Sequence, residues 1–215
     1  MKRDLPYKSG DGLSDYERSR CLLDLHLPGN SHDFPTLVWF HGGGLQDGSK
    51  EANANVHEHL TANGIAVASA NYRLSPGVSY PAYIEDAAAA VAWVLDRVES
   101  HGGDPGCVPV SGQMVVHSTI RAERGIQGYV QIVDGAAPIH HARDDAPPFL
   151  NITGDGDNEG RSDENRRFVE ALCEAGHGDA VFVEIEGRDH CGVIDGVGRP
   201  GDRVAELMVE FIGRS

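Results

Sequence analysis

Three consecutive glycines, Gly42, Gly43 and Gly44, follow His41 and form the arrangement in this chain that most directly suggests chemistry. Backbone N–H groups in such a loop can stabilise the negative charge that develops on a carbonyl oxygen after a nucleophile attacks the carbon. The chain contains no Gly-x-Ser-x-Gly sequence, the sharp turn that usually presents a reactive serine. The residues therefore predict part of an acyl-transfer site without its attacking group.

The elements that must position this loop are short β-rich runs that alternate with longer helical stretches. Residues 36–40 form a continuously apolar run that ends at His41, as expected of a buried central strand that opens into a glycine loop. Leu23, Leu25 and Leu27 alternate with polar residues and indicate an earlier strand with one wetter face. The pattern further predicts a helix, a buried strand and a long alanine-rich helix over residues 51–63, 65–70 and 82–100.

A second regular block follows an irregular one. Residues 108–112 are typical of a short strand, but no amphipathic helix follows them, and residues 113–148 show little clear periodicity. Beyond them the pattern predicts a strand, a helix capped by Ser162 and closed near Gly176, a second strand and a final helix, with the other bounds at 149–153, 180–186 and 202–212. This alternation predicts an α/β fold with a mainly parallel sheet covered by helices on both faces.

Composition limits the class of protein. The 215 residues are 40% hydrophobic and 24% charged, which predicts one soluble globular domain over residues 1–215. A net charge of −15 argues against nucleic acid or an anionic membrane surface as a partner. The N-terminus does not resemble a secretory signal, and no apolar run reaches membrane-spanning length. The four cysteines lack paired Cys-x-x-Cys spacing, so we expect neither a zinc site nor a disulfide framework, and a cytoplasmic location.

Longer motifs add a resemblance to a known family. The stretches at 37–44, 71–76, 80–94 and 102–105 read LVWFHGGG, NYRLSP, YPAYIEDAAAAVAWV and GGDP. Together they resemble the HGGG-type esterases and lipases of the α/β-hydrolase fold, a carboxylesterase family of the BD-FAE kind. The likeness resumes at residue 146 and continues through His190 to the C-terminus. It implies a carboxylic-ester hydrolase that acts on small acyl or acetylated-sugar esters and uses no cofactor.

The resemblance also implies roles for individual residues. The N–H groups of residues 42–44 correspond to the oxyanion hole, His190 to the general base and Asp157 to the carboxylate that orients it, with Asp155 a weaker candidate. A carboxylate at the end of a strand can hold one imidazole tautomer and stabilise its charged form, and this fold uses the order carboxylate, then histidine. The plainer alternatives are an ordinary glycine turn and an exposed polar pair formed by Asp189 and His190.

The resemblance to the family ends at the position where the nucleophilic serine is expected. Family members continue from Val-Ser-Gly into His-Ser-Ala-Gly-Gly, whereas Ser111 and Gly112 are followed here by Gln113 and Met114. If the register is kept, Met114 takes the place of the serine, and a thioether cannot be deprotonated to attack an ester. A second alignment matches the stretch from Ser111 onward to the family's segment after the next strand. On that alignment the elbow, its helix and one strand are missing as a single block, and the fold is truncated.

Other residues fit the place of the nucleophile poorly. Ser111 lies inside the expected strand rather than at the turn beyond it, and we keep it as a weak candidate. Ser118 lacks flanking glycines, and Ser162 is better explained as a helix cap. Cys107 and Cys191 lack the context of an elbow, so we expect both to be free structural cysteines.

No metal site is expected. His57 and His59 are two residues apart on a predicted helix and face different sides, and the adjacent His140 and His141 also diverge. Residues 41–48 lack the Gly-Lys-Ser/Thr of a phosphate-binding loop.

Three hypotheses stay open. The chain is an ester hydrolase with an unrecognised nucleophile, a non-catalytic relative that binds a small ligand or a protein, or the deletion product of an esterase gene. Loss of a central block would uncover apolar surface. We therefore also expect a homo-oligomer or low stability, unless residues 113–148 cover that surface.

Overall fold

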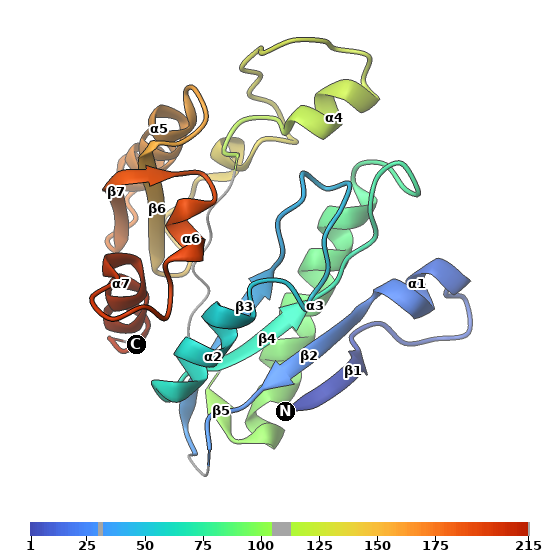
Figure 1. Cartoon of the computed structure of the whole chain (residues 1–215). Helices are drawn as coiled ribbons and strands as arrows, with labels where there is room; N and C mark the ends of the chain where they lie inside the picture. The colour runs from blue at the N-terminus through green and yellow to red at the C-terminus, as the bar shows by residue number, and fades with distance from the viewer. Residues whose placement is uncertain (30–31, 105–112, 215) are drawn as a thin grey trace. The chain divides into compact units, whose positions relative to one another are not determined.

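The computed structural model describes residues 1–29, 32–104 and 113–214, and the chain divides into two compact units (Figure 1). One unit comprises Met1–Cys107 with Ile212–Ser215, and the other comprises Val108–Phe211. The expectation of one domain over residues 1–215 stays a prediction. The strand expected over residues 108–112 lies outside the described residues.

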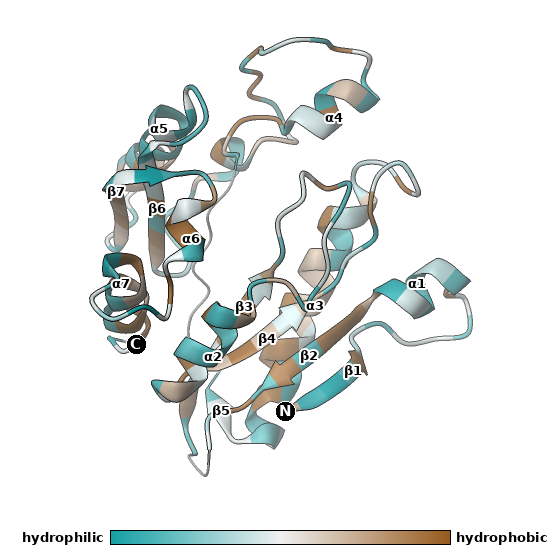
Figure 2. Ribbon diagram, in the orientation of Figure 1, coloured by the Kyte–Doolittle hydropathy of each residue, from teal (hydrophilic) through white to brown (hydrophobic). Residues whose placement is uncertain are grey.

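The first unit is built on a five-stranded sheet with the order β1-β2-β4-β3-β5. The strands are β1 (Lys2–Pro6), β2 (Leu22–His26), β3 (Phe34–Phe40), β4 (Ala66–Ala70) and β5 (Gly103–Asp104). β3 runs parallel to β4 and to β5, whereas β2 pairs antiparallel with both β1 and β4. All five residues of β4 are buried, and the central strands are the brown, hydrophobic part of this unit in Figure 2. The strands predicted around residues 23–27, 36–40 and 65–70 are thereby confirmed.

Two helices cover this sheet. α2 (Ala54–Ala62) connects β3 to β4, and α3 (Ala82–Arg97) connects β4 to β5. Because β4 and β5 lie on opposite sides of β3, two right-handed crossovers place these helices on opposite faces of the sheet (Figure 1). A 3-10 turn (Val98–His101) extends α3 as far as Gly102, whose φ of 88° ends the helical path.

The second unit contains two parallel strands, β6 (Phe149–Gly156) and β7 (Ala180–Asp189), joined by α5 (Arg161–Glu174). The pairing begins with Phe149 opposite Ala180 and shifts between Gly154 and Gly156, where β6 ends. After β7 come a single turn, α6 (Gly192–Asp195), and the last helix, α7 (Arg203–Ile212). This strand–helix–strand–helix order is the one predicted.

One local prediction was wrong. Ser162 does not cap α5, because the helix begins at Arg161 after Gly160, and the Ser162 hydroxyl instead bonds to Thr153 and Glu184. The stretch described as irregular over residues 113–148 contains one short helix, α4 (Ser118–Glu123), and a 3-10 turn at Pro138–His141.

Two short elements of the first unit were not foreseen. β1 is an exposed strand, and α1 (Asp15–Arg20) begins with a capping box formed by Ser14 and Glu17. Across the three described ranges, no helix is both long enough and apolar enough to cross a bilayer.

Candidate active site

The glycine loop begins directly after β3 and has a backbone that only glycine adopts easily. Gly43 and Gly44 have φ values of 111° and 63°, in the left-handed region. The Gly43 carbonyl accepts hydrogen bonds from the N–H groups of Gln46 and Asp47, at 3.0 and 3.1 Å. A Cβ on Gly43 would lie 2.2 Å from the Asp47 carbonyl oxygen, so this turn closes only around glycine. Residues 42–44 are all exposed, as a loop that receives a ligand must be.

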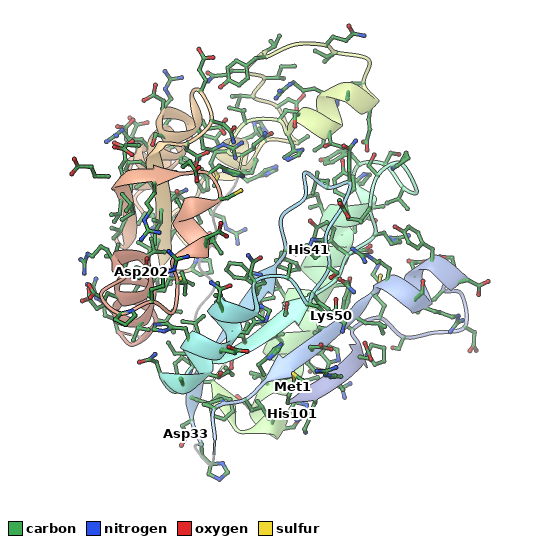
Figure 3. All side chains as sticks on the ribbon, in the orientation of Figure 1. Met1, Asp33, His41, Lys50, His101 and Asp202 are labelled. Carbon is green, nitrogen blue, oxygen red and sulfur yellow. The ribbon has the colours of Figure 1, made fainter. Side chains whose placement is uncertain are left out.

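His41, labelled in Figure 3, directly follows β3, and its contacts hold the start of the glycine loop. Its Nδ1 lies 2.7 Å from the Gly42 carbonyl oxygen, and its ring stacks on Tyr72 with a centroid separation of 4.5 Å. The Tyr72 hydroxyl donates in turn to the His41 carbonyl at 2.9 Å. Arg20 at the end of α1 donates to the Gly48 carbonyl and to the Tyr72 carbonyl, at 2.6 and 3.0 Å. One guanidinium therefore connects the far end of the loop to the segment after β4.

These contacts define the state of the buried His41 ring. Arg20 can only donate, so the His41 Nε2 that lies 3.3 Å from Nη2 accepts, and Nδ1 carries the proton that bonds to Gly42. Burial and the neighbouring Arg20 charge lower the pKa of His41, against the opposing effect of the Gly42 carbonyl. His41 is therefore a neutral positioning residue for the loop and not a proton carrier.

The second unit brings His190 and Asp157 together. His190 follows the last residue of β7, and its Nδ1 lies 2.9 Å from Oδ1 of Asp157, just beyond β6. The two side chains differ in exposure, at 56% for His190 and 7% for Asp157. A sheltered carboxylate that holds an exposed imidazole is the arrangement of a general base and its orienting acid. The weaker candidate, Asp155, instead accepts from the Gly187 N–H at 2.8 Å.

Residues on both sides of His190 hold it in place. Arg188 donates to the Gly192 carbonyl at 2.7 Å and to Asp202 at 2.6 Å. Asp189 accepts from the Gly192 N–H at 2.7 Å, so the backbone around His190 is tied to α6. Asp202 is buried and also accepts from the Ala205 N–H at the start of α7, which makes it a cap for that helix (Figure 3).

The sequence alone did not predict these supporting contacts. The position of Asp202 at the start of a predicted helix could have indicated its capping role. No spacing rule, however, links Arg188 to Asp202 or Arg20 to the glycine loop, because those contacts form only in the folded chain.

Met114 lies in the core of the second unit. Its side chain is 2% exposed and packs with Phe168 and Leu172, and its carbonyl accepts from the Ile139 N–H at 3.0 Å. A residue in this environment is not presented at an accessible turn, whichever alignment of the family motif is used. The structure thus gives position 114 a packing role.

Among the described residues, no hydrogen bond joins Ser118 or Cys191 to His190. Ser111 and Cys107 lie outside the described residues. Ser118 is the first residue of α4, where its N–H bonds to Gln113. Cys191 adjoins His190 in the sequence and is a free, exposed cysteine. Within the three described ranges, no group of three or more potential metal ligands is found.

The chain is similar to one protein-family model and to several esterases. The BD-FAE family model matches residues 23–114, somewhat less than half of the chain. Esterase LipQ of Mycobacterium tuberculosis is 24% identical over 265 residues, which cover 98% of this chain and 61% of that protein. Carboxylesterase NlhH of the same species is 37% identical over 104 residues, which cover 47% of this chain and 31% of NlhH. The chain thus spans about three fifths of one relative and a third of the other.

Solved structures agree on the fold. Esterase 2 of Thermogutta terrifontis, in its apo form, superposes with a TM-score of 0.75 at 22% identity, over 99% of this chain and 94% of that one. The esterase of Pyrobaculum calidifontis gives a TM-score of 0.70 at 25% identity, over 89% and 80% of the two chains. The fold is therefore the α/β-hydrolase fold.

Proposed function

Because the chain has the α/β-hydrolase fold and is similar to esterases over both units, we propose that it is a carboxylic-ester hydrolase relative whose serine-dependent turnover is impaired. The proposed ligands are small acyl or acetylated-sugar esters. The first part of the proposal, the relation to ester hydrolases, rests on the 2.9 Å contact between His190 and Asp157. This pair is the general base of an acyl-transfer site with its orienting carboxylate. Asp157 would hold the Nδ1 proton, which leaves Nε2 to accept a proton from whatever group attacks the ester.

The missing nucleophile carries the second half. The chain has no Gly-x-Ser-x-Gly sequence, and Met114, which takes the place of the serine if the family register is kept, is buried. The LipQ alignment extends over 265 positions against the 215 residues of this chain, so that relative has at least 50 further residues inside the aligned region. That difference supports a loss of residues from within this chain relative to LipQ, which the deletion alignment requires.

Location and partners belong to the same proposal. An acidic chain with a net charge of −15 is suited to small neutral esters rather than to nucleic acid or anionic membranes. Acyl transfer by this route requires no metal and no organic cofactor. We place the protein in the cytoplasm.

The test is hydrolysis of a short-chain aryl ester together with labelling by a fluorophosphonate probe, on the full chain. Loss of a triad member still leaves a rate about a thousandfold or more above water, so we expect slow turnover or none, and no covalent adduct. Ser111→Ala should leave the residual rate unchanged, with Ser118→Ala as the matched control. A stoichiometric adduct on any serine would overturn the proposal, and mass spectrometry of the adduct would identify the nucleophile.

A further inference from the structure

A short segment of the second unit has the sequence of a strand but pairs with no strand among the described residues. Residues 126–132 read Ile-Gln-Gly-Tyr-Val-Gln-Ile, with apolar residues at 126, 130 and 132 and glutamines at 127 and 131. The alternation is too short to stand out in the irregular stretch around it. Within the described ranges these residues belong to no sheet. A backbone bond ties each end to the unit: the Ile126 N–H donates to the Arg121 carbonyl at 2.9 Å, and the Ile132 carbonyl accepts from the Val116 N–H at 2.8 Å.

The segment exposes more apolar surface than its neighbours. Tyr129, Val130 and Val133 are 59%, 46% and 57% exposed. The Tyr129 hydroxyl contacts the Gln131 amide at 3.2 Å and lies close to Gly160, so the ring rests on the start of α5. A β-prone, uncharged stretch without proline that is exposed in this way is suited to pairing with another strand.

The order of residues in the segment indicates what that other strand is. The sequence is nearly palindromic about Tyr129, since Ile126 mirrors Ile132 and Gln127 mirrors Gln131. In an antiparallel pair of two identical segments with Tyr129 on the two-fold axis, each residue faces its mirror position. Tyr129 would then face Tyr129, each isoleucine an isoleucine and each amide an amide, which are favourable cross-strand pairs, and Gly128 would face Val130.

The charges that flank the segment fit the same symmetry. Arg124 and Asp134 are equally distant from Tyr129 in the sequence and opposite in sign. Within one copy they form a partly exposed ion pair at 2.7 Å, of a kind that contributes little to stability. Pairing that extended this far would place Arg124 of each copy opposite Asp134 of the other. Residues 125–133 themselves carry no charge, so two copies of a chain with net charge −15 can approach there with the least repulsion.

We propose that residues 126–132 form an antiparallel, two-fold contact with the same residues of a second copy of this chain. Gly128, which has a φ of 80° in the structure, straightens in this contact, a change that glycine makes at little cost. The contact would be isologous and would close at a dimer.

The test replaces the mirror-related glutamines with charges. Gln127→Lys combined with Gln131→Lys places lysines opposite lysines, and the dissociation constant of the dimer should rise at least about tenfold. Gln127→Lys combined with Gln131→Glu places lysine opposite glutamate, and the dimer should persist. The double-lysine variant also lowers the net negative charge of the chain, so repulsion between whole molecules would favour the opposite result.

Sedimentation equilibrium of the full chain gives the readout, with circular dichroism to confirm that each variant folds. The double-lysine variant mixed with Gln127→Glu/Gln131→Glu should form a heterodimer although each alone is monomeric. A wild-type chain that is monomeric at 100 μM, on the order of the weakest interface that would be useful, would overturn the proposal. So would a double-lysine variant that dimerises as tightly as wild type.

Discussion

At the scale of single residues, two histidines both direct Nδ1 toward an oxygen but differ in burial and in their neighbours. His41 is buried and neutral between a carbonyl and a guanidinium, whereas His190 is exposed beside a sheltered carboxylate. In both rings Nδ1 faces an oxygen that accepts a hydrogen bond. The buried His41 ring serves only to hold the backbone of the glycine loop, because the lone pair on its Nε2 already accepts a hydrogen bond from Arg20. The exposed ring is the one whose Nε2 is left for proton transfer.

Asp157 should determine which nitrogen of neutral His190 carries the proton. A carboxylate accepts only, so we expect the Nδ1–H form to dominate in wild type. Nitrogen-15 NMR of the imidazole at a pH where it is neutral should show Nδ1 protonated and Nε2 not. Asp157→Ala should return the ring to the mixture of a free imidazole, with Asp155→Ala as the control. Equal mixtures in wild type and variant would contradict the contact.

Met114 should be sensitive to substitution by serine. Removing a buried methionine side chain costs about 2–5 kcal/mol, and an unpaired hydroxyl in an apolar core adds to that cost. Met114→Ser should therefore lower the free energy of unfolding by several kcal/mol, measured by chemical denaturation with circular dichroism. Leu95→Ser, at an exposed helical position, should change it by less than about 1 kcal/mol. A neutral effect at position 114 would mean that the side chain is not packed as described.

At the scale of elements, the loop after β3 is specified by backbone shape rather than by side chains. Its glycines are not equivalent. A Cβ on Gly43 would overlap the Asp47 carbonyl, whereas a Cβ on Gly42 would meet nothing within 4 Å. The loop therefore depends on Gly43 for its closure.

Gly43→Ala should destabilise the first unit by about 1–3 kcal/mol, because it combines an unfavourable φ with a clash against backbone. Gly42→Ala is the matched control and should be close to neutral. Both tryptophans, Trp39 and Trp93, lie in this unit, so their fluorescence during urea unfolding reports on it alone. Equal losses in the two variants would show that closure does not depend on Gly43.

The buried His57 on α2 makes the free energy of unfolding depend on pH. Burial, with a smaller effect of His26, lowers the pKa of His57 to about 4, and no hydrogen-bond partner for its Nε2 is found in the described residues. The unfolded chain binds this proton from about pH 6.5 downward. Stability should therefore be full above pH 6.5 and fall between about pH 6.5 and 4, by roughly 3 kcal/mol from this group.

The check is the slope of unfolding free energy against pH over that window. His57→Leu should reduce the slope by about one proton, whereas His59→Gln should not change it. An unchanged slope in His57→Leu would assign the acid sensitivity of the first unit to other groups.

At the scale of the whole molecule, net charge opposes association. A charge of −15 on a chain of this size produces repulsion between copies over about a Debye length. If the contact is made by the uncharged segment 126–132, added salt screens the repulsion without weakening the contact.

The dimer should therefore tighten as salt rises. We expect the dissociation constant to fall between about 20 and 300 mM sodium chloride, as the Debye length shrinks from about 20 to 6 Å. Sedimentation equilibrium at several salt concentrations measures it. A dissociation constant that rises with salt would indicate an interface held by ion pairs.

Much of this architecture could be predicted from the sequence, because apolar runs report burial directly. The run at 36–40 and the alternation around Leu23 both became strands of the first sheet. β1 could not be found, because Lys2, Arg3 and Asp4 give an exposed edge strand no apolar signal. α4 was missed because a helix of six residues has too few turns to show a period.

The candidate site was only partly accessible in the same way. Resemblance indicated Asp157 and His190, and the structure brings them within 2.9 Å, while their catalytic roles stay predictions. The ties that hold them, such as Arg188 to Asp202, join residues that no local rule connects. Such contacts depend on how β7 and α7 pack against each other, and the spacing of apolar residues in the sequence does not determine that packing.

The burial of Met114 has an evolutionary consequence. A position that packs against Phe168 and Leu172 has been recruited into the stability of its unit, so selection acts on its volume rather than on its reactivity. A change to serine here would leave a cavity and an unpaired hydroxyl between those side chains, so the stability of the unit opposes it. Any descendant that regained acyl transfer would therefore have to evolve its attacking group elsewhere in the chain, or acquire it by insertion.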